Sequence, residues 1–201
     1  MKLLLTSTGL TNINVRGKFI SLFEKDFSNT KVLFVTSASE SPRQEWYVNQ
    51  SREELLELGI KEENFVEYHD GDKPSKDVLD EIDLIYVCGG NTFHLLEELK
   101  KSSLDKDIIE MIKKDIFYIG ASAGSIIVTP TIGVAKPWDS NDRELKDLSG
   151  FSLINFTLVP HYENKDEETI IGIERELGVE IKRITDDQAV LVLDDGVMII
   201  K

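Results

Sequence analysis

The chain has 201 residues, of which 41% are hydrophobic and 30% charged, and its formal net charge is −14. This length fits one globular domain, so we predict a single α/β domain over residues 1–201. An acidic surface repels nucleic acid and anionic membranes, and Cys88, the one cysteine, excludes a disulfide framework and a four-thiolate metal site.

No apolar stretch approaches the roughly 20 residues that a transmembrane helix needs. The apolar run within residues 1–6 is too short for a secretory signal sequence. We therefore expect a cytoplasmic protein that binds neither membranes nor nucleic acid.

Short apolar runs alternate with helix-forming stretches along the chain. Strands are predicted at 2–6, 31–36, 64–69, 83–90, 116–120, 156–161, 188–193 and 197–200, and helices at 15–27, 43–59, 92–101, 106–115 and 165–177. Several of the strand runs are apolar at consecutive positions, which is typical of parallel strands covered on both faces. The alternation predicts a three-layer α/β sandwich with a mostly parallel sheet. The sequence Leu193-Asp194-Asp195-Gly196 predicts that this sheet ends in an antiparallel hairpin.

Ligands of open parallel sheets bind beyond the carboxyl ends of the strands. Three predicted strands end in unusual segments: CGGNTF after Val87, GASAGS after Ile119 and PHY after Val159. We expect the functional site where these segments meet.

Residues 120–124 match G-x-S-x-G between a predicted strand and a helix-forming segment. A sharp strand-to-helix turn presents a nucleophilic serine, and only small neighbours avoid clashes there. All four neighbours of Ser122 are Gly or Ala, so we interpret Ser122 as a nucleophile. The alternative is a closely packed turn in which Ser122 is a plain N-cap. Ser125 would lie inside the helix, and Cys88 is expected to be buried.

Gly89 and Gly90 follow a predicted strand and precede a helix. Glycines there let the backbone approach a substrate, and the N–H of Gly90 together with that of Ala123 could stabilise an oxyanion. Asn91 is expected to border this site, and either Asn91 or Thr92 is expected to cap the following helix. The alternative is a turn that needs glycine only for its backbone angles.

The chain has three histidines, His69, His94 and His161. His161 follows a predicted strand and Pro160, so we expect it at the same edge as Ser122, where it can act as general base. His69 also ends a strand-like run and stays an alternative, whereas His94 is expected on the surface or in packing. No two of the three have the i, i+4 spacing of a helical zinc pair, and we expect neither a metal nor another cofactor.

The acid that orients the histidine is harder to place. Between Ser122 and His161 the sequence offers Asp139, Asp142, Glu144 and Asp147. Asp139 follows the bulky pair Pro137-Trp138, which could anchor the loop. At least three of the four are expected to be solvated loop charges, and the alternative is that all four are.

Together, the segments 88–96, 118–132 and 158–162 resemble the S51 serine peptidases, the family of dipeptidase E and cyanophycinase. The resemblance implies a fold related to class I glutamine amidotransferases and hydrolysis of small peptides through a Ser-His-Asp acyl-enzyme mechanism. It implies Ser122 as nucleophile, His161 as base and an acid in the loop between them, where Asp139 lies. The T-N-D-x-P pattern of the family is absent from this loop, and Pro137 stands in its ungapped register.

One departure from the family concerns specificity. Relatives of dipeptidase E carry an arginine after a Glu-Thr pair, which suits an aspartyl substrate, but here Glu168-Thr169 is followed by Ile170. A substrate carboxylate would lack its bidentate partner. Lys165, Arg143 and Arg175 are the cations that could substitute, and aspartyl specificity stays open.

Two other functions stay open, a serine esterase or thioesterase of small substrates and a non-catalytic α/β binding protein. The predicted strands 188–193 and 197–200 follow His161, whereas a small α/β-hydrolase normally carries its histidine after the last core strand. A homodimer is a further possibility that the edge of such a sheet raises.

Overall fold

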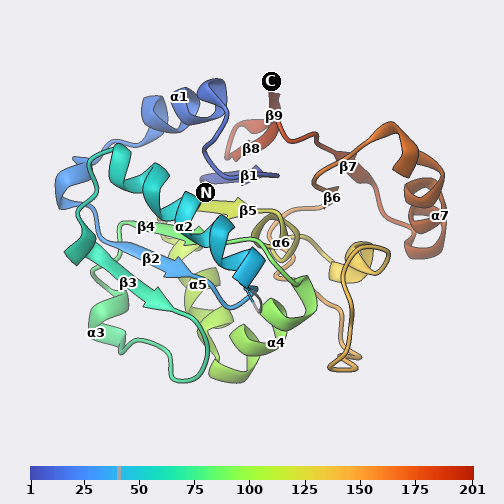
Figure 1. Cartoon of the computed structure of the whole chain (residues 1–201), viewed down its shortest axis with the longest axis horizontal. Coiled ribbons are helices and arrows are strands. Elements are labelled where there is room, and N and C mark those ends of the chain that lie inside the picture. Colours follow the sequence, from blue (N-terminus) through green and yellow to red (C-terminus); the bar gives the residue numbers. More distant parts are fainter. Residues whose placement is uncertain (40–41) are drawn as a thin grey trace.

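The computed structural model describes the backbone of residues 1–39 and 42–201 and the side chains outside residues 40–44 (Figure 1). Its strands are β1 (Leu3–Thr6), β2 (Val32–Val35), β3 (Phe65–Tyr68), β4 (Leu84–Val87), β5 (Phe117–Ala121), β6 (Thr157–Val159), β7 (Ile181–Arg183), β8 (Ala189–Leu193) and β9 (Gly196–Ile200). Its helices are α1 (Ile13–Leu22), α2 (Pro42–Glu57), α3 (Lys76–Leu79), α4 (Thr92–Ser102), α5 (Leu104–Lys113), α6 (Ala123–Ile126) and α7 (Glu167–Leu177). None of these described helices has the length and apolar character needed to cross a membrane.

The central sheet of the described chain has the strand order β3-β2-β4-β5-β1-β8-β9. Strands β1 to β5 pair in parallel, while β8 pairs antiparallel with β1 and β9 pairs antiparallel with β8. Leu193 and Gly196 are partners across the last turn. The mostly parallel sheet and its antiparallel C-terminal hairpin are confirmed.

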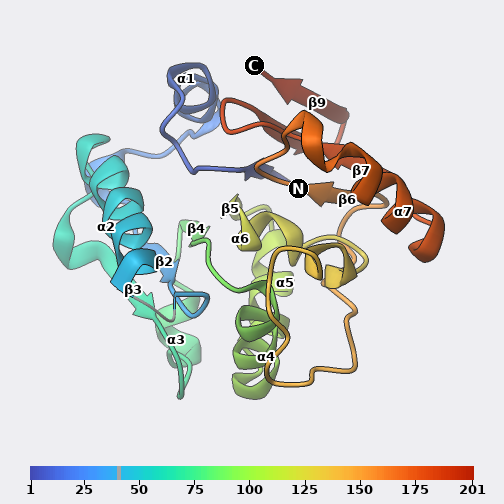
Figure 2. The same cartoon turned by 45° about the vertical axis from the view of Figure 1, so that its right-hand side comes forward.

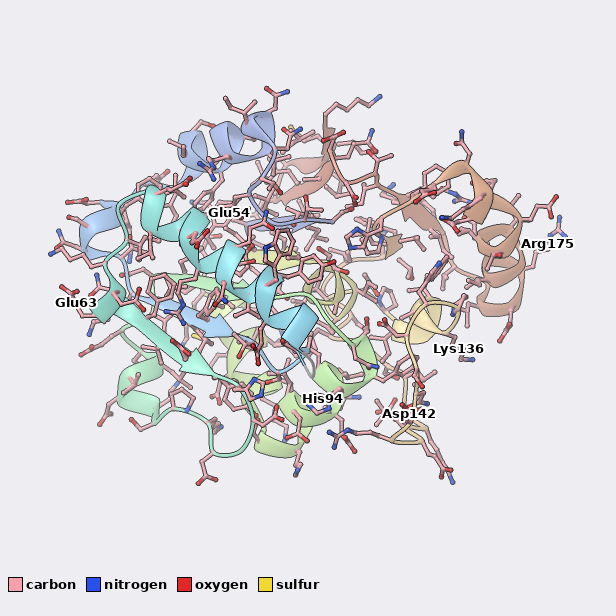
Figure 3. All side chains as sticks on the ribbon, in the orientation of Figure 1. Glu54, Glu63, His94, Lys136, Asp142 and Arg175 are labelled. Carbon is pink, nitrogen blue, oxygen red and sulfur yellow. The ribbon has the colours of Figure 1, made fainter. Side chains whose placement is uncertain are left out.

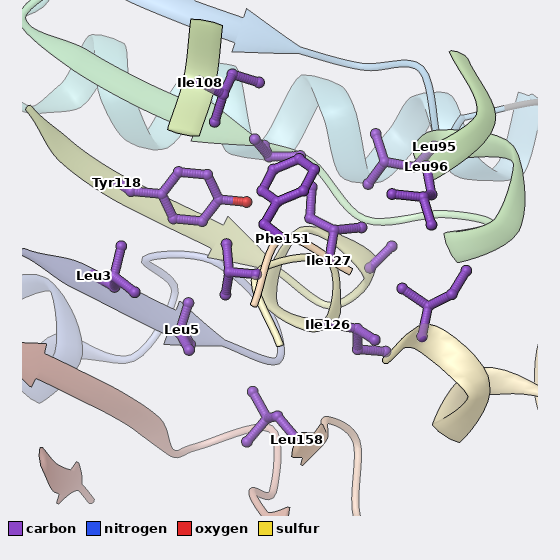
Figure 4. Packing of buried hydrophobic residues seen from close by; sticks show 14 of the residues in the cluster. Leu3, Leu5, Leu95, Leu96, Ile108, Tyr118, Ile126, Ile127, Phe151 and Leu158 are labelled. Atoms are coloured by element: carbon purple, nitrogen blue, oxygen red, sulfur yellow. The ribbon is translucent and has the colours of Figure 1, made fainter. Parts of the chain in front are cut away.

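Helices cover both faces of the sheet. Successive side chains of a strand point to opposite faces, so the consecutive apolar residues make both faces apolar. Leu4 belongs to a buried cluster with Phe19 of α1 and Leu55 of α2. Leu3 and Leu5 belong to a second cluster that includes residues of α4, α5 and α6 (Figures 2 and 4). The consecutive apolar positions of the strands are thus explained, and the three-layer arrangement is confirmed.

The strand that precedes His161 differs from the prediction. We expected residues 156–161 in the central sheet, but β6 pairs with β7 in a separate two-stranded parallel sheet of the described chain. This pair and α7 lie together to one side of the central sheet (Figure 1). Sequence patterning missed β7, because it has three residues and two of them are the polar Lys182 and Arg183.

The last strand leaves an apolar edge. Val197, Met198 and Ile199 of β9 are each about half exposed, and β9 is the last strand of the central sheet. The homodimer remains a prediction. Light scattering, which measures the mass of the particle in solution, tests it.

Candidate active site

Ser122 lies in the turn that joins β5 to α6. Its backbone angles are φ 49° and ψ −109°, a combination that costs a non-glycine residue energy unless the surroundings impose it. The Ser122 N–H donates to the carbonyl of Thr6 in the neighbouring strand at 2.9 Å. The sheet therefore holds Ser122 in a strained conformation.

Close backbone approaches explain the glycines beside Ser122. A Cβ at Gly124 would lie 2.3 Å from the carbonyl oxygen of Val87, and one at Gly120 would lie 2.5 Å from that of Gly124. Any side chain at these positions would push apart strands and helix at the turn. Packing thus requires glycine at residues 120 and 124.

We expect Gly124→Ala to lower the free energy of unfolding by about 2 kcal/mol, because its Cβ has no room. Gly172→Ala is the matched control, since Gly172 lies in α7 with nothing within 4 Å of the added Cβ. It should stabilise the protein by about 0.5 kcal/mol. Denaturant unfolding compares the two, and equal effects would contradict this account.

His161 faces Ser122. Its Nε2 lies 3.0 Å from Ser122 Oγ, and its Nδ1 lies 2.6 Å from Oδ1 of Asp186. When a carboxylate accepts the proton on Nδ1, a neutral imidazole keeps the lone pair of Nε2 for a hydroxyl proton. This arrangement can deprotonate Ser122.

The end of β1 fixes the segments that carry these side chains. Ser7 Oγ accepts the N–H of His161 at 3.1 Å and donates to the carbonyl of Thr185 at 3.1 Å. Thr8 Oγ1 donates to the carbonyl of Asp186 at 3.0 Å. Residues that follow β1, β6 and β7 thus meet beside Ser122, although β6 lies outside the central sheet. Neither Ser7 nor Thr8 was predicted as a site residue from the sequence.

Asp139, which we expected to orient His161, makes other contacts. Its Oδ2 accepts hydrogen bonds from the N–H of Thr92 at 2.9 Å and from Thr92 Oγ1 at 2.6 Å. Burial raises the pKa of the Asp139 carboxyl, although the two bonds from Thr92 oppose the rise. Asp139 thereby ties its loop to the first residue of α4, and Asp186 occupies the place at Nδ1.

The other candidate groups lie elsewhere. Asp142, Glu144 and Asp147 are exposed loop residues, and Asp142 is visible at the rim of the molecule in Figure 3. His94 is buried in α4 with its Nε2 3.2 Å from Asp70. His69 Nδ1 lies 3.1 Å from the Thr36 hydroxyl.

The two alternative nucleophiles are buried. Ser125 Oγ donates to the carbonyls of Thr6 and Gly120 at 2.8 and 2.7 Å. Cys88 is fully buried, and burial raises the pKa of its thiol well above the usual range. Neither group is presented to a substrate.

The Gly89-Gly90 turn lies against Ser122. A Cβ at Gly89 would lie 3.1 Å from Ser122 Cβ, and Gly90 has φ 138° with its Cβ position 1.9 Å from the Ala38 carbonyl oxygen. Both the positive φ and the short distance to Ala38 require glycine at residue 90. Ala123 is the first residue of α6, so its N–H has no carbonyl acceptor within that helix.

Asn91 has a structural set of contacts. Its Oδ1 accepts the N–H groups of Phe93 and His94 at the start of α4, and its Nδ2 donates to the Ser140 carbonyl at 2.8 Å. The predicted N-cap is confirmed, and these bonds occupy the side chain that we also considered for substrate binding.

A pocket of about 520 Å³ opens at Ser122. The segment after β1 and one face of α2, which includes Trp46 and Tyr47, form its walls, and Gly89, Gly90 and His161 border it. This volume can hold an amino acid residue of a small substrate.

A buried carboxylate joins the two walls. Glu54, which lies on α2 (Figure 3), is 4% exposed. Its Oε2 accepts the N–H of Leu10 at 2.8 Å, and its Oε1 accepts a hydrogen bond from Gln50 Nε2 at 3.2 Å. Burial raises the pKa of Glu54, and these two bonds partly offset the rise. Glu54 thereby fixes the segment after β1 relative to α2.

The pKa of Glu54 is higher in the folded state than in the unfolded state. The free energy of unfolding therefore falls as the pH rises from the unfolded-state pKa to the folded-state pKa. Glu54→Gln keeps an acceptor for Leu10 and cannot ionise. We expect its free energy of unfolding to increase relative to wild type between pH 5 and pH 8. Glu54→Ala should cost about 1–3 kcal/mol at both pH values, because the buried N–H loses its acceptor. A parallel pH dependence of wild type and Glu54→Gln would contradict the assignment.

The position that suggested altered specificity is buried. Ile170 is 0% exposed in the core. Arg143 lies 3.3 Å from Glu97, and Lys165 lies 2.8 Å from Glu163. Figure 3 shows Arg175 on α7, at the far side from α2.

The serine turn, the facing imidazole and the sheet topology define an α/β serine hydrolase. Comparison with known families identifies it further, because the model of peptidase family S51 matches residues 3–200. The chain belongs to this family and is a serine peptidase, as the resemblance implied.

Similar proteins are also peptidases by name. The chain is 34% identical over 185 residues to the uncharacterized peptidase Lin0382 of Listeria innocua, covering 88% of this chain and 87% of that protein. It is 29% identical over 168 residues to Peptidase E of Salmonella newport, covering 82% and 69%. A crystal structure of a candidate Peptidase E protein from Listeria monocytogenes EGD-e superimposes with a TM-score of 0.81 at 29% identity, covering 98% and 96%.

Proposed function

We propose that the protein hydrolyses small peptides through an acyl-enzyme on Ser122, with His161 as general base and Asp186 as the orienting acid. The observation that carries this proposal is the continuous contact from Asp186 Oδ1 to His161 Nδ1 and from His161 Nε2 to Ser122 Oγ. The strained turn at Ser122 is the geometry of a nucleophile elbow.

In the first step Ser122 Oγ attacks the scissile carbonyl carbon while its proton moves to His161 Nε2. The N–H groups of Gly90 and Ala123 stabilise the oxyanion. His161 then gives the proton to the leaving amine, and the C–N bond breaks. A water molecule, deprotonated by His161, attacks the ester, and the carboxylic acid product leaves with the Ser122 hydroxyl restored.

Asp186 takes the place that we had given to Asp139. A carboxylate at Nδ1 selects the tautomer that can accept the serine proton and stabilises the imidazolium that follows. Asp139 is held by Thr92, so we assign it the support of the turn that carries Gly90.

Hydrolysis of dipeptides in the presence of hydroxylamine tests the acyl-enzyme. We expect an acyl hydroxamate to form at the expense of the free acid, because both nucleophiles attack one ester. A p-nitrophenyl ester panel run in parallel separates the esterase alternative. Turnover of esters without any peptide hydrolysis, or the absence of hydroxamate, would contradict the proposal.

A further inference from the structure

An aromatic pair lines the same pocket as Ser122. Trp46 and Tyr47 are consecutive residues of α2 and remain 61% and 45% exposed. Their ring centroids lie 5.0 Å apart in an edge-to-face arrangement. Large aromatic side chains that stay exposed beside a pocket are typical of ligand-binding surfaces.

The described side chains that line the pocket carry negative charge. Of the lining side chains that the structure describes, the charged ones are Asp186 and Asp187. Asp186 contacts His161, whereas Asp187 is exposed and has no ion-pair partner among the described residues. The net charge of −14 adds a field of the same sign.

We propose, on the basis of the proposed function, that this pocket selects peptides with a basic residue, Lys or Arg, on the acyl side of the scissile bond. The aliphatic stem lies along Trp46 and Tyr47, and the cationic end pairs with Asp187. The acyl residue is the one placed here, because it stays attached to Ser122, which borders the pocket. An acidic side chain would meet two carboxylates of its own sign.

Dipeptides of the form Xaa-Leu test this charge selection, with Lys, Met and Glu as Xaa. Lys and Met share an unbranched stem, so their ratio of kcat/KM isolates the charge. We expect Lys-Leu to exceed Met-Leu by about fivefold, with Glu-Leu the poorest, since an exposed ion pair contributes up to about that factor. The preference should fall as NaCl is added.

Variants assign the preference to its residues. Asp187→Asn should bring the ratio of Lys-Leu to Met-Leu close to one. Asp195→Asn is the matched control, because Asp195 is an exposed acid in the turn between β8 and β9, and it should leave the ratio unchanged. Trp46→Ala should lower kcat/KM for both peptides together, by about tenfold, because it removes the surface that their stems share.

Binding to the Ser122→Ala variant gives a readout that does not depend on turnover. Tighter binding of Lys-Leu than of Met-Leu, lost in Ser122→Ala/Asp187→Asn, would support the proposal even if the catalytic assignment failed. Equal binding of the two peptides, tighter binding of Glu-Leu, or a preference that survives Asp187→Asn would overturn it and leave the acyl-enzyme mechanism untouched.

Discussion

Ser122→Ala is expected to reduce kcat/KM for peptide hydrolysis by at least about 10⁴-fold, because no other described hydroxyl contacts His161 Nε2. The variant removes one oxygen and leaves the bond from the backbone N–H of residue 122 to Thr6. Its thermal unfolding should therefore match that of wild type. Initial rates with dipeptides and a melting curve measure the two quantities.

Ser125→Ala is the control for this prediction. Ser125 is buried and bonded to the carbonyls of Thr6 and Gly120, so its loss should cost about 1 kcal/mol of stability while turnover persists. A Ser122→Ala enzyme that retains a tenth of wild-type activity would contradict the assignment of the nucleophile.

Asp186→Asn should reduce kcat by about 10⁴-fold, because an amide at Nδ1 favours the tautomer whose Nε2 carries a proton and cannot accept one. Asp139→Asn keeps an oxygen for the Thr92 bonds, so we expect kcat to fall by less than about tenfold. The two variants change the charge equally and are compared at saturating substrate. A larger loss in Asp139→Asn would return the acid role to Asp139.

The sequence was sufficient to predict the mostly parallel sheet with its C-terminal hairpin and two of the three proposed catalytic residues, but not the separate sheet of β6 and β7. Consecutive apolar residues identify buried strands such as β2 and β4, because both faces of a parallel strand are covered. Small residues around Ser122 identify the strained turn, because a Cβ at Gly124 meets the Val87 carbonyl. These features are local and are visible within a few residues.

Asp186 could not be found in the same way. It follows His161 by 25 residues, whereas the family resemblance places the acid before the histidine. Its position depends on β7, whose polar residues give no apolar run, and on the pairing of β7 with β6. The signal that was available is the sequence Thr185-Asp186-Asp187, which one residue, Gln188, separates from the first residue of β8, Ala189.

The supporting contacts were hidden for the same reason. Ser7 connects the backbone of His161 to the carbonyl of Thr185, and these residues lie far apart in the sequence. Hydroxyl groups of this kind have no local pattern, because their partners are fixed by tertiary packing.

Labelling with a fluorophosphonate, followed by peptide mapping, tests most directly whether Ser122 is activated by His161 and Asp186. We predict one adduct per chain, on Ser122, forming rapidly in wild type and in Asp139→Asn and at least about 100-fold more slowly in Asp186→Asn. An adduct on another residue, or equal rates in the Asp186→Asn and wild-type proteins, would contradict the account.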